Sequence, residues 1–150
     1  MKSTRALMVL AAGLLAAAAT AKEKKVQLQD LPPAVQAAVQ VQTKDLPSFR
    51  ISEEQEDGKT VYEVETHVNG LSRDLLIDTS GVVVEVEEEI DPARLPEAAR
   101  QAVERVSGGG IIRKVEAVTR DGATEYEVAV KGGSGKSKVV VTGDGTIRKE

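Results

Sequence analysis

The feature that most constrains this chain is an internal repeat. When the sequence is shifted by 64 residues, segment 31–86 lies over segment 95–150 without a gap. The matches include Leu31-Pro32 on Leu95-Pro96, Asp57-Gly58 on Asp121-Gly122, and Tyr62-Glu63-Val64 on Tyr126-Glu127-Val128. Self-similarity at such a period indicates a repeated structural unit, and two copies are too few for a solenoid. We therefore predict a pseudo-symmetric pair of units, joined near Ile90 to Arg94.

Each unit is expected to begin with a helix. Proline is tolerated in the first turn of a helix, and apolar residues recur at helical spacing after Leu31-Pro32 and again after Leu95-Pro96. A breaker follows in both units, from Lys44 to Pro47 in the first and from Gly108 to Gly110 in the second. The sequence therefore predicts one helix at the start of each unit.

Beyond each breaker the pattern alternates around an Asp-Gly turn, which is typical of an antiparallel hairpin. Hairpins centred on Asp57-Gly58 and Asp121-Gly122 set Ile51 opposite Val64 and Val115 opposite Val128, so that apolar pairs share one face. Two further strands are expected in each unit, near 71–78 and 82–87, then near 137–142 and 146–149. The expected fold class is α+β, with two tandem modules that each pack one helix on a four-stranded antiparallel sheet.

The N-terminal segment is typical of a secretory signal peptide. Lys2 and Arg5 precede an uncharged run that ends in Ala19-Thr20-Ala21. This run is shorter than the roughly 20 apolar residues that span a bilayer. We expect a signal peptide at 1–21, a first module at 22–89 and a second at 90–150. The expected location is periplasmic or secreted, with no stable membrane anchor after cleavage.

Composition excludes several classes of site. The chain has no cysteine, which rules out disulfides, thiolate metal sites and cysteine nucleophiles. Its net charge of −4 at pH 7 disfavours nucleic acid as a partner. The aromatic residues are only Phe49, Tyr62 and Tyr126, so the core must consist mainly of Val, Ile, Leu and Ala.

Taken together, these motifs resemble a known family. A Leu-Pro helix start, a breaker, a strand, Asp-Gly, Tyr-Glu-Val and a glycine turn such as Asp78-Thr79-Ser80-Gly81 are similar to PepSY-like domains, also called β-lactamase-inhibitor-like. The resemblance covers almost all of the mature chain, in two tandem copies. It implies a non-catalytic envelope module that binds or inhibits a peptidase or another hydrolase. The chain lacks the disulfides and the aromatic-rich sheet of the β-lactamase inhibitors, which argues against that particular target.

Three patterns resemble a catalytic or ligand-binding site, but each is better explained as solvated surface or an ordinary loop. His67 lies near Ser72, Asp74 and Asp78, yet alternation places it with Glu63 and Glu65 on a solvated face. Segment 132–137 imitates the end of a phosphate-binding loop, but Val130 replaces the required glycine and a strand pattern follows. The acidic clusters at 53–57 and 85–91 lack the ligand spacing of a calcium loop and are expected to be solvated.

Two glutamates occupy the same place in both units. Glu63 and Glu127 are each flanked by residues expected to face the core, so both should point to the open side of the sheet. We predict a partner-binding face that carries Glu63, Glu65, His67 and Glu127. The alternative is structural, with Glu63 paired to Arg50 and Glu127 paired to Lys114 on the adjacent strand.

The sequence therefore predicts a non-catalytic exported binding module whose partner is another envelope or secreted protein, and the expected role is to inhibit or regulate an envelope peptidase or another hydrolase. No catalytic residue, cofactor or metal ligand is predicted. The alternative is an envelope protein that binds a small ligand or a divalent metal. An exposed apolar patch on the open face would favour the first function, and a closed pocket with converging polar groups would favour the second.

Overall fold

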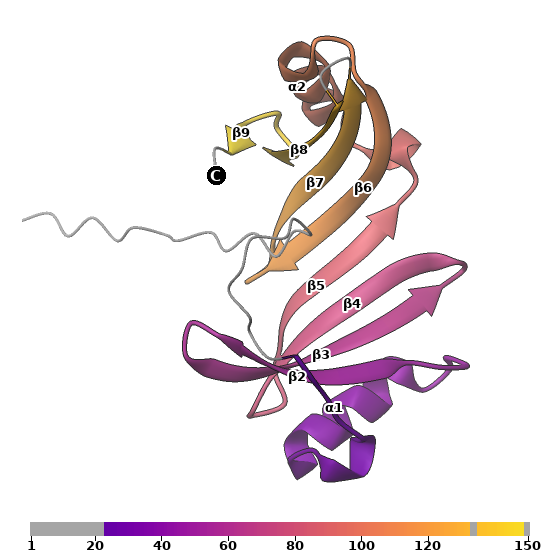
Figure 1. Cartoon of the computed structure of the whole chain (residues 1–150), viewed down its shortest axis with the longest axis vertical. Coiled ribbons are helices and arrows are strands. Elements are labelled where there is room, and N and C mark those ends of the chain that lie inside the picture. The colour runs from indigo at the N-terminus through magenta and orange to yellow at the C-terminus, as the bar shows by residue number, and fades with distance from the viewer. Residues whose placement is uncertain (1–22, 133–134, 149–150) are drawn as a thin grey trace, which may run out of the picture.

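The computed structural model describes residues 23–132 and 135–148, and within these ranges nine strands form one antiparallel sheet (Figure 1). The strands are β1 (Lys24–Lys25), β2 (Arg50–Glu56), β3 (Lys59–Val68), β4 (Leu71–Asp78), β5 (Val83–Ile90), β6 (Ile111–Arg120), β7 (Ala123–Gly132), β8 (Gly135–Thr142) and β9 (Ile147–Arg148). The helices are α1 (Pro33–Thr43) and α2 (Glu97–Ser107), preceded by the short 3-10 turns η1 (Leu28–Asp30) and η2 (Pro92–Arg94). The expected signal peptide at 1–21 lies outside the described residues.

The predicted arrangement of two tandem modules, each with one helix packed on a four-stranded antiparallel sheet, is wrong. The sheet is continuous from β1 to β9, because β5 pairs with β6 from Glu85 opposite Arg120 to Ile90 opposite Val115. An unpaired β5 would present a free sheet edge, and pairing with β6 satisfies its backbone groups. The expected boundary between 89 and 90 therefore falls at the end of a central strand rather than in a linker.

The hairpin register follows the sequence prediction. Ile51 lies opposite Val64, and Val115 lies opposite Val128. Both turns have positive φ at their two central residues, with Asp57 at 49° and Gly58 at 75° in the first. Such turns match the right-handed twist of paired strands, and this accounts for the Asp-Gly signal at both positions.

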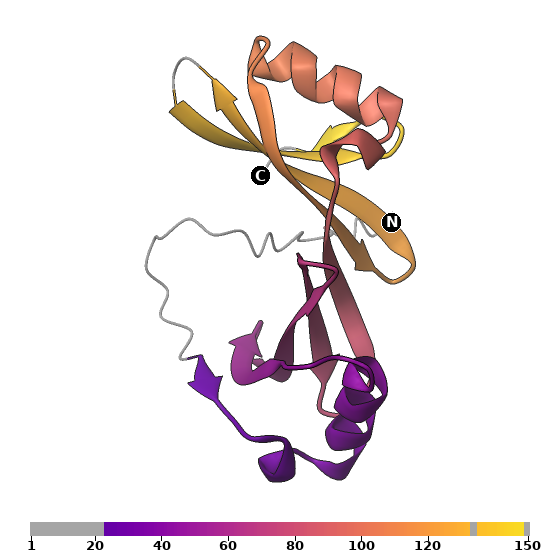
Figure 2. The same ribbon diagram turned by 90° about the vertical axis from the view of Figure 1, so that its right-hand side faces the viewer.

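Both helices cover the same face of the sheet, although they lie at opposite ends of the molecule (Figure 1, Figure 2). Successive side chains of a strand alternate between faces, so Val86 and Ile90 of β5 point the same way. Val86 packs against the core under α1, which contains Val35, Val39 and Val64, and Ile90 packs against the core under α2. Neither helix among the described residues is long and apolar enough to cross a membrane.

Tyr62, Val64, Tyr126 and Val128 lie on the helix-covered face, as the register requires. The first two belong to the cluster that contains Val39. Val128 is fully buried in the cluster that contains Val103, and Tyr126 packs against it. The alternate residues of the same strands must therefore lie on the opposite face.

Two glycines allow the β4–β5 turn and the β8–β9 turn to lie close against the helices. At Gly81 an added Cβ would lie 2.6 Å from the Ala34 carbonyl oxygen in the first turn of α1. At Gly145 the corresponding distance to the Ala98 carbonyl oxygen of α2 is 2.7 Å. Both glycines have positive φ, 85° and 88°. Only glycine meets both conditions without strain, which explains why the two positions match in the sequence repeat.

Candidate binding face

The side chains that point away from α1 and α2 form what we call the open face. The strand register arranges them in three rows across the sheet. The rows are Ser52, Glu63, Leu76, Glu85 and Arg120; then Arg50, Glu65, Asp74, Glu87, Val118, Glu125 and Thr142; then Glu89, Glu116, Glu127, Val140 and Arg148. Acidic residues outnumber basic ones in these rows, so the open face is predominantly acidic.

The predicted site residues share this face but do not meet. Glu63 and Glu65 belong to neighbouring rows on β3, and His67 lies further along the same strand, exposed and opposite Ser72. Glu127 lies on β7, four strand spacings away, which corresponds to about 19 Å. They therefore mark one face and not one compact site.

The ion pairs of the open face differ from the expected ones. Arg50 pairs with Glu65, which is directly opposite it, rather than with Glu63. Lys114 lies 2.7 Å from Glu116 on its own strand. A bulge between Ile112 and Lys114 shifts the register here, and such irregularities redirect side chains.

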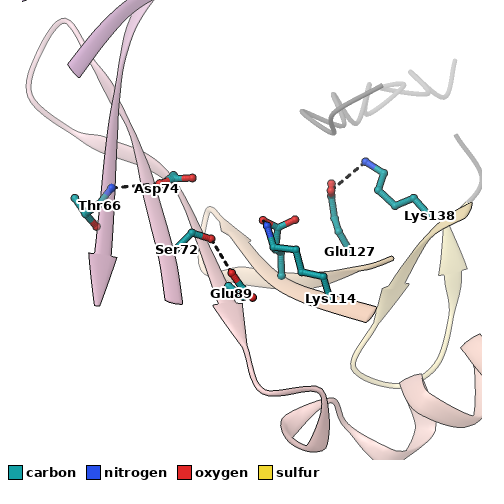
Figure 3. Close-up of polar contacts among 8 residues, drawn as sticks. Thr66, Ser72, Asp74, Glu89, Lys114, Glu127 and Lys138 are labelled. Atoms are coloured by element: carbon teal, nitrogen blue, oxygen red, sulfur yellow. Dashed lines mark hydrogen bonds and ion pairs between the residues drawn. The ribbon is translucent and has the colours of Figure 1, made fainter. Parts of the chain in front are cut away.

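Glu127 is more buried than alternation alone suggested. Its residue is 7% exposed, and its carboxylate accepts a hydrogen bond of 3.0 Å from the Lys138 ammonium (Figure 3). Lys138 comes from β8, so the pair crosses a strand boundary. Because a buried carboxylate without a partner is costly, this contact offsets part of the cost of burying Glu127.

The sequence did not predict the burial of the acidic residues Glu85 and Glu87 on β5. Glu85 is 7% exposed and forms an ion pair with Arg120 across the β5–β6 boundary, while Glu87 is half-buried. Both were expected to lie in a solvated acidic cluster, and for Glu85 that expectation is wrong. Alternation with Val86 does place both on the open face. Their burial, however, follows from the central position of β5, which requires the continuous sheet.

Several carboxyl groups on this face have raised pKa values. Burial, followed by a hydrogen bond and repulsion from Glu54, raises the pKa of Glu63 to about 8. Burial, followed by a hydrogen bond and repulsion from Glu85, raises the pKa of Glu87 to about 9. Burial also raises the pKa of Asp74, against a hydrogen bond from the Thr66 amide that lowers it. The open face therefore carries less negative charge near neutral pH than its composition suggests.

Apolar residues lie between the acidic ones, but they are not accessible. Val61, Leu76, Val118 and Val140 on the open face are each at most 6% exposed. The most exposed large aliphatic residue of the described chain, Val41 at 74%, lies on α1. These four side chains therefore form no exposed apolar patch, and over them a partner would meet charged and polar groups first.

Three observations in the described ranges bear on metal and ligand binding. Residues 23–132 and 135–148 contain no group of three or more His, Asp or Glu side chains arranged to hold a metal ion. An open polar hollow of about 300 Å³ lies beside β1 and is lined by Glu23, Lys25, Arg50, Ile51, Ser52 and Glu65. Residues 135–142 form strand β8, as expected, where a phosphate-binding loop would lead into a helix.

One antiparallel sheet with two helices on one face is also the architecture found in proteins of known structure. A protein of the DUF2874 family from Bacteroides uniformis has 20% identity and a TM-score of 0.66, covering 79% of this chain and 86% of that one. A Bacteroides eggerthii protein described as periplasmic has 15% identity and a TM-score of 0.67, with the same coverage. A BLIP-like protein from Bacteroides fragilis has 18% identity and a TM-score of 0.60, covering 79% and 84%.

These similarities establish the fold, and they agree with the β-lactamase-inhibitor-like part of the resemblance seen in the sequence. No family model matches the chain, so the narrower assignment to PepSY-like domains in two copies stays a prediction. No curated protein matches it either. The periplasmic description of the Bacteroides eggerthii protein agrees with the location expected from the sequence.

Proposed function

We propose that this protein is a non-catalytic exported binding protein of the periplasm, and that its open face binds another envelope protein, with a hydrolase as the candidate partner. The observation that carries the proposal is the open face itself, which neither α1 nor α2 covers and which presents three rows of mainly acidic side chains. The fold it shares with a BLIP-like protein supports a hydrolase as the kind of partner. The PepSY-like resemblance in two copies supports the same reading.

The charges of the open face determine how it would bind. Glu65 and Glu127 form ion pairs with Arg50 and Lys138, so part of the negative charge of the face is already partnered within the protein. Charged groups at an interface mainly affect the association rate and the choice of partner. Binding at this face should therefore weaken as salt increases.

The test removes charge from the open face without changing side-chain size. In the variant Glu65→Gln with Glu127→Gln, both residues keep their shape, whereas reversal to lysine would place two cations together at Lys138. The partner is first identified by cross-linking in envelope extract, then purified, and its affinity is measured at low and high salt. We expect a loss of about 1 kcal/mol at low salt, roughly fivefold, and a weaker salt dependence.

The matched control is Glu97→Gln with Glu104→Gln. Both residues are exposed on α2, on the opposite side of the sheet, and their replacement changes the net charge by the same amount. The control should bind like the natural protein. Equal affinity of the folded open-face variant and the control at low salt would contradict binding at this face.

A further inference from the structure

Glu85 and Glu87, at the centre of the sheet, each have a buried carboxylate oxygen that no neighbouring group in the described part of the chain donates to. Glu85 and Glu87 alternate on β5 and point to the same face, at the boundary where β5 meets β6. Among the described residues, Oε1 of Glu85 and Oε1 of Glu87 are both buried and have no hydrogen-bond donor. Burying a carboxylate oxygen without a donor is costly, so two such atoms at alternate positions of one strand need an explanation.

Most of the charged groups around the pair are acidic. The titratable and charged groups around it are Glu56 from β2, Asp74 from β4, Glu89 from β5 itself, Lys114, Glu116 and Arg120 from β6, and Glu127 from β7. Arg120 forms its ion pair with Glu85, and Lys114 forms its ion pair with Glu116. Glu87 faces Asp74 on one side and the apolar Val118 on the other. Its position therefore favours a neutral carboxyl group.

We propose that Glu85 and Glu87 hold one proton between them at neutral pH, as a carboxyl–carboxylate hydrogen bond beside the β5–β6 boundary. When this proton is lost to water, the pairing of β5 with β6 becomes less stable. Glu87 is assigned as the donor, because Glu85 is the member of the pair that forms an ion pair with Arg120. One proton then satisfies both orphan oxygens at once. Its loss would leave two negative charges side by side in a half-buried position.

The direction of the pH effect follows from the titration of Glu87. Burial and Glu85 raise its pKa to about 9, whereas the ordinary value is 4.5. Between these values the folded protein holds a proton that the unfolded chain lacks, so stability falls as the pH rises through this window. Loss of the proton also adds one negative charge to the open face. If the proposed function holds, the affinity for the partner will change over the same pH range.

The experiment follows the side-chain carboxyl carbons of glutamate by NMR in the purified protein, with resonances assigned by substitution. We expect one step above about pH 7 that both Glu85 and Glu87 report, since coupled groups titrate as a pair. The variant Glu87→Gln should abolish this step, because its amide donates permanently to Glu85. Glu89→Gln is the control on the same strand and face, and it should leave the step in place.

A second measurement follows the denaturant midpoint from about pH 6 to about pH 9. The natural protein should lose stability over this range, and Glu87→Gln should lose less. Titration of both glutamates below about pH 6 would overturn the proposal, as would equal pH dependence of the two proteins. Neither readout involves a partner, so failure of the proposed function would leave this test unaffected, and the reverse is also true.

Discussion

Replacing Gly81 by alanine tests the contact between the β4–β5 turn and α1. A left-handed φ of 85° costs an alanine about 1–2 kcal/mol. The new Cβ would also lie 2.6 Å from the Ala34 carbonyl oxygen and 2.8 Å from its carbon, which are backbone atoms in the first turn of a helix. Relief requires the turn and the helix to separate, and overpacking of this kind costs about 1–3 kcal/mol. Together the two effects predict a loss of about 2–5 kcal/mol, a large share of a typical folding free energy.

Gly58→Ala is the matched control. Gly58 has a φ of 75°, but nothing lies within 4 Å of its added Cβ. It should therefore show only the backbone cost of about 1–2 kcal/mol. Denaturant midpoints followed by circular dichroism give both values. If Gly81→Ala is no more destabilising than Gly58→Ala, the close approach to α1 contributes nothing and the reasoning fails.

Two other positions give separate predictions. Val128→Ala removes a fully buried side chain and should cost about 1–3 kcal/mol in denaturant unfolding, whereas Val41→Ala, at a position 74% exposed, should cost far less; equal losses would contradict the assigned core. Hydrogen bonds from the Thr142 hydroxyl and the Thr146 amide lower the pKa of Asp144 from 3.8 to about 2. Its stabilising effect is therefore present above the higher value and is lost as the pH falls through the lower one. Asp144→Asn should be less stable than the natural protein at neutral pH, and the difference should shrink towards pH 2; a constant difference would exclude the charge as its cause.

Local structure could be predicted because local signals determine it. The Asp-Gly pairs require positive φ and specify tight hairpins, so the pairing of Ile51 with Val64 followed from the turn alone. Alternation then placed Glu63 and Glu127 on the face opposite the helices. These inferences need only a few neighbouring residues, and the repeat supported each of them twice.

The joining of the two halves could not be predicted in this way. The pairing of Glu85 with Arg120 links residues 35 apart, across a helix, and no turn specifies it. Without the β5–β6 pairing, the burial of Glu85 and Glu87 could not be predicted either. A glutamate on an edge strand is more exposed to water than one on a central strand. The ion pairs also depended on details that alternation omits, since the bulge before Lys114 determines which carboxylate it reaches.

The order of strands in the sheet has a consequence for how the chain folds. Each strand from β1 to β9 pairs only with the strand immediately before it and the strand immediately after it in the sequence. The two helices lie between strands without changing that order. Apart from the β1–β2 and β5–β6 pairings, which span the helices, these contacts close short loops, so their entropic cost is small, which favours fast folding. A chain delivered N-terminus first can add strands one at a time to a growing edge. With no cysteine in the sequence, none of these steps has to wait for oxidation.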